Sequence, residues 1–367
     1  MSGGRHYLDH ASTSPLRPGV AEAMAPWVGS ADPGRIHTEG RMARVALEDA
    51  RERIAAALGC RGGREVVLTS GATEAVAMAT WGAIRRTPGG AVVAAAVEHS
   101  CVREWATRAG GGVVEPPVDA TGRLSLDGVD LAGAALVHVQ WGNHEVGTLQ
   151  PVAEAVARAR VAGALVHVDA AQAVGRVPVD FAALGADLLS VSAHKLGGPR
   201  GVGALLVRRG LRLDPLLVGG AQERLRRAGL ENVAGAVGFA AALEGLDPAA
   251  EGARQHALAE RLLVEGAGGD GVHRYTPEPR LPHIACFGLD EVEAEPVLLG
   301  LDQAGVAVHS GSSCSSELLE PSAVLLAMGV DGDRSLRASV GWSTTDDDVT
   351  AFLDALPSVL ASLRSLR

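Results

Sequence analysis

The stretch HVDAAQAVGRVPVDFAALGADLLSVSAHKLGGPRGVG, residues 167–203, decides the fold class of this 367-residue chain. It contains the short apolar run Asp187–Ser192 and overlaps two more, Leu165–Asp169 at its start and Val202–Arg208 at its end. The runs are nearly continuous rather than alternating, which is typical of strands covered on both faces. Three similar runs precede them, at Glu65–Thr69, Ala91–Val97 and Ala135–Gln140.

Helical stretches separate these runs, at about Gly40–Leu58, Thr73–Arg85, Ser100–Ala109, Val152–Ala162 and Ala170–Val174. Such alternation predicts an α/β fold with a mostly parallel sheet covered by helices on both sides. The glycine run at 109–114 is interpreted as a loop.

The pattern changes near Gly245, where a long helix at about Gln255–Glu265 is followed by shorter strands and helices. A further helix is expected to start near Pro321. We therefore expect a large domain over residues 12–247 and a smaller α+β domain formed by residues 1–11 and 248–367.

The composition excludes several classes of protein. The chain is 47% hydrophobic, enough for a large core, and its net charge of −10 with no basic patch argues against a nucleic-acid partner. Neither a signal peptide nor a membrane-spanning apolar run is visible. The four cysteines are far apart, which argues against a metal site or disulfide framework and suits a reducing cytoplasm.

The strongest chemical signal is S-x-H-K at Ser192–Lys195, at the end of a predicted strand and before a glycine-rich loop. Open α/β sheets bind ligands at this edge, and a desolvated lysine there can form a Schiff base. Asp169 ends the preceding strand, where it could hold a pyridinium nitrogen protonated or simply cap a helix.

Two more strand ends face the same edge. Thr73, in the SGATE run at 70–74, starts a helix whose N-terminus suits a phosphate. The same residues also fit an ordinary capping box. His99 could stack on a planar cofactor and move protons, although a lone histidine is more often structural. Together with Lys195 and Asp169, these residues predict one shared site.

Two residues near the C-terminus carry chemistry of their own. Cys314 lies among serines and glycines, and a cysteine in such a loop is better explained as a reactive thiol than as core. Arg337 follows in a predicted strand, where it could clamp a substrate carboxylate or be an ordinary surface arginine.

These motifs, taken in order, resemble a known family. YLDHASTSP (7–15), SGATE (70–74), EH (98–99), NHEVG (143–147), HVDAAQ (167–172), SAHK (192–195), GGAQER (219–224) and SGSSCSSELLEPS (310–322) are similar to those of the cysteine desulfurases. These belong to pyridoxal-phosphate (PLP) fold type I and are related to class V aminotransferases. The resemblance covers nearly the whole chain and favours the branch with a long cysteine-bearing loop.

The resemblance implies a seven-stranded-type sheet, PLP as cofactor, L-cysteine as substrate, a homodimer and a protein that accepts the sulfur. Lys195 would hold PLP, Asp169 would pair with its ring nitrogen, and Gln172 would contact its phenolic oxygen. His99 would stack on the ring and transfer protons. Ala72, Thr73, Ser192 and His194 would bind the phosphate, Asn143 and Arg337 the substrate, and Cys314 would be the nucleophile that becomes a persulfide.

The chain departs from the family pattern at three places. His144 replaces a second asparagine near the PLP oxygen, Leu230 replaces a threonine that reaches the neighbouring subunit's phosphate, and Ala75–Ala77 replace Ser-Asp-Asn. These changes suggest a specialised paralogue. Other hypotheses are a related PLP enzyme (an aminotransferase, an epimerase, or a C–S or selenocysteine lyase) and a non-catalytic scaffold without PLP.

Overall fold

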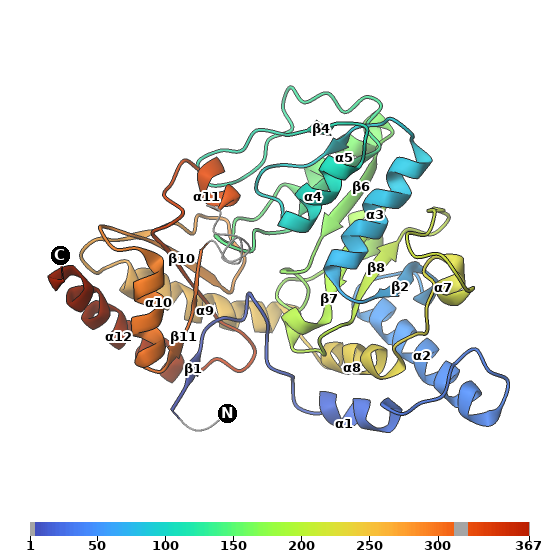
Figure 1. Cartoon of the computed structure of the whole chain (residues 1–367), viewed down its shortest axis with the longest axis horizontal. Coiled ribbons are helices and arrows are strands. Elements are labelled where there is room, and N and C mark those ends of the chain that lie inside the picture. Colours follow the sequence, from blue (N-terminus) through green and yellow to red (C-terminus); the bar gives the residue numbers. More distant parts are fainter. Residues whose placement is uncertain (1–3, 312–321, 367) are drawn as a thin grey trace.

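The structure, a computed structural model, describes residues 4–311 and 322–366. Its central feature is a seven-stranded sheet in the order β2-β8-β7-β6-β5-β3-β4 (Figure 1). The strands are β2 (Val66–Thr69), β3 (Val92–Val93), β4 (Val113–Val114), β5 (Leu136–Gln140), β6 (Leu165–Asp169), β7 (Leu188–Ser192) and β8 (Gly203–Val207). From β4 to β7 neighbours are parallel, whereas β8 runs antiparallel to β7 and β2. The predicted mostly parallel α/β sheet is confirmed.

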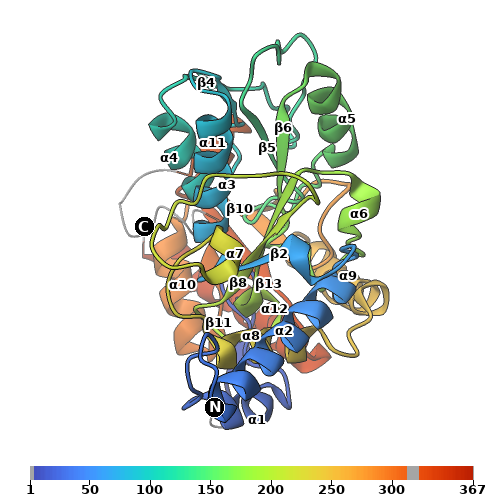
Figure 2. The same cartoon turned by 90° about the vertical axis from the view of Figure 1, so that its right-hand side faces the viewer.

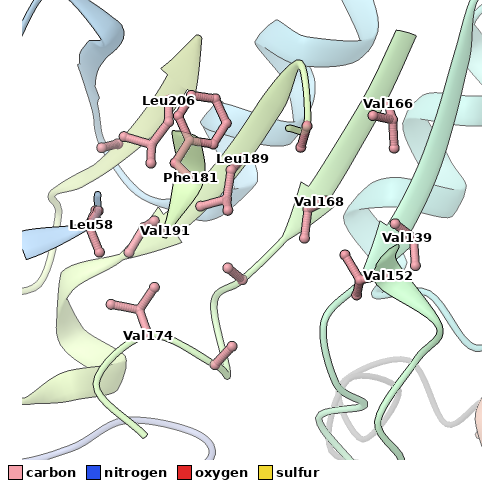
Figure 3. Close-up of a cluster of buried hydrophobic side chains, with 14 of the residues drawn as sticks. Leu58, Val139, Val152, Val166, Val168, Val174, Phe181, Leu189, Val191 and Leu206 are labelled. Carbon is pink, nitrogen blue, oxygen red and sulfur yellow. The ribbon is translucent and has the colours of Figure 1, made fainter. Parts of the chain in front are cut away.

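Alternate residues of each strand face opposite sides of this sheet, and both sides are buried. One face, with Val168 and Val191 (Figure 3), packs against helices α2 (Thr38–Ala57), α5 (Val152–Ala162) and α8 (Val233–Leu243). The other face packs against α3 (Ala72–Arg86), while α4 (Ser100–Arg108) packs against α3. Burial on both faces explains why the strands are continuous apolar runs in the sequence.

Short elements complete this part of the chain. They are α1 (Val20–Met24), α6 (Phe181–Leu184), α7 (Gln222–Leu225) and the 3-10 turns η1 (Ala25–Trp27), η2 (Gly63–Glu65) and η3 (Ala193–Leu196).

Two local predictions were wrong. Residues 170–174 form turns instead of a helix, because the amides of Ala173 and Val174 both bond to the Ala170 carbonyl and the helical ladder does not advance. The glycine run at 109–114 ends in a strand, β4, because Val92 and Ala94 of the neighbouring segment donate to the carbonyls of Gly112 and Val114.

A second sheet, in the order β12-β13-β10-β9, is antiparallel and lies beside the first (Figures 1 and 2). Its strands are β9 (Val272–Arg274), β10 (Ile284–Leu289), β12 (His309–Ser310) and β13 (Ser335–Ser339), and its helices are α9 (Pro248–Gly266), α10 (Ala294–Gln303) and α12 (Asp346–Ser365). The short helix α11 (Ala323–Ala327) packs its Val324 and Leu325 into the core of the first sheet instead. Helices α9, α10 and α12 share with the second sheet a hydrophobic core of its own, in which the rings of Phe287 and Phe352 stack 6.0 Å apart. The smaller α+β unit of the predicted fold is therefore present.

The N-terminal segment contributes to this second unit. Strand β1 (His6–Tyr7) pairs in parallel with β11 (Val306–Ala307), and Leu8 lies in the second core. Helix α9 begins at Pro248 after an N-cap at Asp247, whose side chain accepts from the amides of Ala249 and Ala250. The domain limits at residues 11/12 and 247/248 stay predictions.

In the described part of the chain, no single helix is long and apolar enough to cross a membrane. Helices α8 and α9 together have the length and apolar composition, but they are bent by 74° relative to each other.

Candidate active site

A cavity of about 580 Å³ opens at the edge of the large sheet where β6 and β7 end. The size is typical of a small-molecule site. It brings together most of the residues that the sequence predicted: Ala72, Thr73, His99, His144, Asp169, Gln172, Ser192, His194, Lys195 and Arg337. The segment Ala11–Thr13, near the N-terminus, forms part of the wall, and sequence reasoning did not single it out for the site.

Lys195 reaches this cavity from the 3-10 turn η3, directly after β7. The turn ends at Gly197, where φ is 88° and a Cβ would lie 2.7 Å from Arg17 Cγ and 3.1 Å from the Pro15 carbonyl oxygen. Only glycine fits this left-handed and crowded position. Lys195 Nζ donates a hydrogen bond to the Ala11 carbonyl, which holds the amine at the cavity wall.

Asp169 is the last residue of β6 and its carboxylate is fixed. Its Oδ1 accepts from Ser190 Oγ at 2.8 Å and from the Ala171 amide at 3.1 Å. The sequence suggested either a partner for a pyridinium nitrogen or a cap. The structure is compatible with both hypotheses, because the carboxylate caps the following turn and also lines the cavity.

Gln172 is oriented by two partners. Its Nε2 donates to the Ala11 carbonyl at 2.8 Å, and its Oε1 lies 3.0 Å from His283 Nε2. Burial and nearby cationic groups hold the pKa of His283 well below its usual value, so this imidazole is neutral. An amide oxygen only accepts, so His283 Nε2 carries the proton and donates it.

The wall at the start of α3 suits a phosphate. Gly71, the N-cap, has no side chain to satisfy the first amides of this 15-residue helix, so the helix end favours an anion. Thr73, Ser192 and His194 stand beside it. Burial and the charge of Lys195 lower the pKa of His194 to about 4, so it is neutral at neutral pH and can donate one hydrogen bond.

Arg200 and Gly201 also line this wall and were missed by the sequence reasoning. Arg200 is exposed and lies in the glycine loop after Lys195. An isolated arginine in a turn carries no periodic signal, and only its closeness to Lys195 could have pointed to it.

His99 also lines the cavity, and it is the N-cap of α4. Its Nδ1 accepts from the Cys101 amide at 3.2 Å and lies 3.1 Å from Cys101 Sγ. In the neutral ring the proton is therefore on Nε2. The ring of His144 lies 5.1 Å from that of His99, centroid to centroid, at an angle of 56°.

Arg337 enters the cavity from β13 of the second sheet and is 1% exposed. Its guanidinium donates to the His144 carbonyl at 2.8 Å, to Asp9 Oδ1 at 3.0 Å and to Ser12 Oγ at 2.9 Å. An arginine held in this way presents a positioned cation for a carboxylate.

Asn143 was expected to bind substrate, but it does not line the cavity. Its Nδ2 donates to the Val97 carbonyl at 3.1 Å, and its Oδ1 accepts from the amides of Glu145 and Val146. These bonds shape the loop that carries His144. Cys314 lies outside the described residues.

Glu98 directly precedes His99, which lines the cavity, and it is a buried acid. Sequence reasoning did not single it out. Its Oε1 accepts from the Gln140 amide at 2.8 Å. Burial raises its pKa to about 8, so it is mostly protonated at neutral pH. The only signal in the sequence was its place beside His99 in the EH pair.

The donors around the cavity fit PLP. An uncapped helix end with hydroxyl and imidazole donors suits its phosphate, a fixed carboxylate suits its ring nitrogen, and a lysine amine suits its aldehyde. A two-unit α/β fold with such a lysine at the sheet edge defines the class of PLP fold type I enzymes.

Comparison with known proteins identifies the family. Residues 6–352 match the model of class-V aminotransferases. The chain is 39% identical to the cysteine desulfurase IscS of Dictyoglomus turgidum, over 98% of this chain and 95% of that protein. The chain belongs to the class-V aminotransferase family and, within it, to the cysteine desulfurases.

Solved structures agree with this assignment. A NifS-like protein superposes with a TM-score of 0.89 at 30% identity, covering 98% of this chain and 100% of that one. The protein SspA, solved in complex with cysteine, superposes with a TM-score of 0.81 at 28% identity, covering 93% and 100%. The fold that the sequence resemblance implied is therefore confirmed.

Proposed function

We propose that this chain is a PLP-dependent cysteine desulfurase that converts L-cysteine to L-alanine and carries the sulfur as a persulfide on Cys314. The observation that supports this most is the gathering of Lys195, Asp169, His99 and Arg337 around one cavity in a chain of this family. SspA, with its bound cysteine, supports the choice of substrate.

The bound cofactor would withdraw electrons from the substrate's Cα and so weaken the bond between Cβ and sulfur. Lys195 would hold the cofactor and move the proton at Cα. Asp169, fixed by Ser190, would keep the ring nitrogen protonated. Thr73 and His194 would hold the phosphate, and Arg337 would bind the substrate carboxylate.

The sulfur transfer balances without an added oxidant. The Cys314 thiolate attacks the substrate sulfur, an S–S bond forms and the C–S bond breaks. Cβ takes up a proton, alanine leaves, and Cys314 carries the persulfide. An acceptor protein would then take the terminal sulfur.

The experiment measures alanine and protein-bound persulfide from L-cysteine, with the cofactor followed by its visible absorbance. Cys314→Ser should keep the absorbance and lose both products. Lys195→Ala should lose the covalently held cofactor. Alanine formation by Cys314→Ser at the wild-type rate would show that another group takes the sulfur, as in a C–S or selenocysteine lyase.

We further propose a homodimer in a reducing, cytoplasmic setting. Large apolar side chains are exposed on and before α2 and on the loop around α7: Ile36, Val45, Val218, Leu225 and Leu230, each at least 64% exposed. Arg224 of the loop is paired with Glu48 of α2 at 2.8 Å, so the two groups adjoin. Such patches mark interaction sites. Cys60 and Cys286 carry free thiols, which suits a reducing compartment.

Sedimentation of the holoenzyme tests the dimer. Leu225→Glu should produce monomers, whereas Val161→Glu, at a 91% exposed position on α5, should not. Equal sedimentation of the two variants would show that this apolar patch is not part of the dimer interface.

The specialised-paralogue hypothesis has structural support at Leu230. This side chain adjoins a small pocket that shares Ser70 and Gly201 with the main cavity, and it supplies no hydrogen bond there. Full complementation of a strain that lacks its general iron–sulfur desulfurase would argue against the hypothesis.

A further inference from the structure

Gln172 and His283 form a hydrogen bond that joins the two units of the molecule beside the cavity. Gln172 lies in the turn after β6 of the large sheet, and His283 directly precedes β10 of the second sheet. Gln172 lines the cavity, whereas His283 is 0% exposed. The His283 carbonyl accepts from the Val340 amide at 2.9 Å, so its backbone is fixed as well. A fixed residue of one unit therefore holds a cavity residue of the other.

The orientation of the Gln172 amide follows from its two partners. One end of the amide lies 2.8 Å from the Ala11 carbonyl oxygen, which only accepts, so this end is the NH2 group. The other end is then the amide oxygen, which lies 3.0 Å from His283 Nε2. Because that oxygen only accepts, His283 Nε2 carries the proton and donates it.

The side chain of His283 makes this one hydrogen bond within the described part of the chain. Its Nδ1 is buried and has no hydrogen-bond partner among the described residues. Polar atoms of buried side chains usually have such a partner. The presence of His283 is therefore better explained by the bond that Nε2 makes to Gln172 than by its own packing.

The charges around His283 keep its ring neutral. The charged or titratable groups that act on it come from the turn after β6, from β13, from the N-terminal segment and from η3: Arg176, Arg337, His10 and Lys195. Burial, together with these groups, holds the pKa of His283 well below its usual value. At neutral pH the ring thus has a single proton, and this proton lies on Nε2 against the Gln172 oxygen.

We propose that His283 is a positioning residue for the cofactor: it holds the Gln172 oxygen so that the NH2 group of Gln172 donates to the phenolic oxygen of PLP. The NH2 group has two protons, and the Ala11 carbonyl accepts one of them. The second is directed to the phenolic oxygen. Without His283, the buried Gln172 oxygen loses its donor, which is costly, and the amide turns towards another one. The inference rests on the part of the proposed function that places PLP in the cavity.

The test is a pH titration of the visible absorbance of the holoenzyme, without substrate. A hydrogen bond to the phenolic oxygen stabilises its anionic form, so loss of that bond should move the titration midpoint to higher pH. Gln172→Leu removes the donor itself and should raise the midpoint by about one pH unit, the usual size of a hydrogen bond to a charged group.

Two substitutions of His283 separate positioning from packing. His283→Gln places an N–H close to the position of Nε2 and should keep the wild-type midpoint. His283→Asn has the same amide on a shorter side chain that does not reach Gln172, so it should raise the midpoint. Both variants bury an amide at the same place, so a purely structural effect would move them alike. His283→Leu, which has no donor, should behave as His283→Asn does, so the comparison does not depend on one variant folding.

A control and a double variant complete the experiment. His138→Asn makes the same change at another buried histidine, which does not line the cavity, and should titrate as wild type does. The double variant His283→Asn/Gln172→Leu should shift no further than Gln172→Leu, because both changes remove the same hydrogen bond to the cofactor. Equal midpoints in His283→Gln and His283→Asn would overturn the inference, and so would additive shifts in the double variant.

Three results separate this inference from the proposed function. If the variants titrate as expected but the wild-type holoenzyme forms no alanine from L-cysteine, the desulfurase activity fails and the role of His283 stands. If alanine and persulfide form but Gln172→Leu leaves the midpoint unchanged, the inference fails and the proposed function stands. A wild-type protein that takes up no PLP would refute both.

Discussion

A buried ion pair between α2 and α7 gives a sharp prediction about stability. Arg51 of α2 and Glu223 of α7 are each 2% exposed at the side chain and are joined by two hydrogen bonds of 2.6 and 2.8 Å. Glu223 Oε2 also accepts from the Leu68 amide of β2 at 3.0 Å. One carboxylate therefore holds a helix, a strand and a loop together.

The loop needs this anchor, because its backbone is in an unfavourable region. Glu223, Arg224 and Leu225 have φ values of 47°, 58° and 65°. Each non-glycine residue in this left-handed region costs roughly 1–2 kcal/mol. The ion pair helps to offset that cost.

Glu223→Leu should lower the free energy of unfolding by about 3–5 kcal/mol, the usual cost of removing one partner of a buried ion pair. Arg51 would keep only the partly exposed Glu48, at 3.5 Å from its Nε. Removing both charges in Arg51→Met/Glu223→Leu should cost less than the single change, because no unpaired charge remains. The assay is urea unfolding of the holoenzyme, followed by circular dichroism. A single variant within about 0.5 kcal/mol of wild type would refute the reasoning, since that is the range of ordinary surface changes.

Three further predictions concern ionisation and backbone strain. Burial raises the pKa of Glu98 to about 8, so between pH 5 and pH 8 the folded protein keeps a proton that the unfolded chain has released. Wild type should therefore lose stability over this range relative to Glu98→Gln. Urea unfolding at both pH values measures the difference. Burial lowers the pKa of His138 to about 3, so as pH falls below about 6.5 the unfolded chain takes up a proton before the folded protein does. The stability of His138→Gln should therefore fall less steeply towards acidic pH than that of wild type. Glu291→Gly should raise the melting temperature, because Glu291 has a φ of 66°, which glycine adopts without strain. Glu295→Gly, inside helix α10, should lower the melting temperature. Similar shifts for both variants would contradict the strain argument.

The regular parts of the fold were predictable because burial leaves a direct mark on the sequence. Leu165–Asp169 and Val152–Ala162 match β6 and α5 residue for residue, since both follow apolar patterns between clear breaks. The strand β4 has no continuous apolar run in the sequence, because Val113 and Val114 lie at the edge of the sheet and are not buried. What makes them a strand is a neighbour some twenty residues earlier in the chain.

From the residues alone, the site was most predictable where a side chain lies at or just after the end of a strand. Lys195 and Asp169 follow strands, and the topology of a parallel sheet brings such ends together. Arg200 reaches the cavity from an exposed turn, and Asn143 turns away from it because its amide bonds to Val97. These outcomes depend on local hydrogen bonding, which sequence periodicity does not report.

The Ala11 peptide unit joins the two halves of the molecule. Its amide donates to Ser339 of the second sheet at 2.9 Å, and its carbonyl accepts from Lys195 and Gln172 at the first. A tag or immobilisation anchor fused ahead of Arg5 should therefore be harmless, whereas trimming the chain through Ala11 would release the lysine amine and unlink the sheets. Anyone who shortens this protein for a sensor or a solid support should leave its first dozen residues intact.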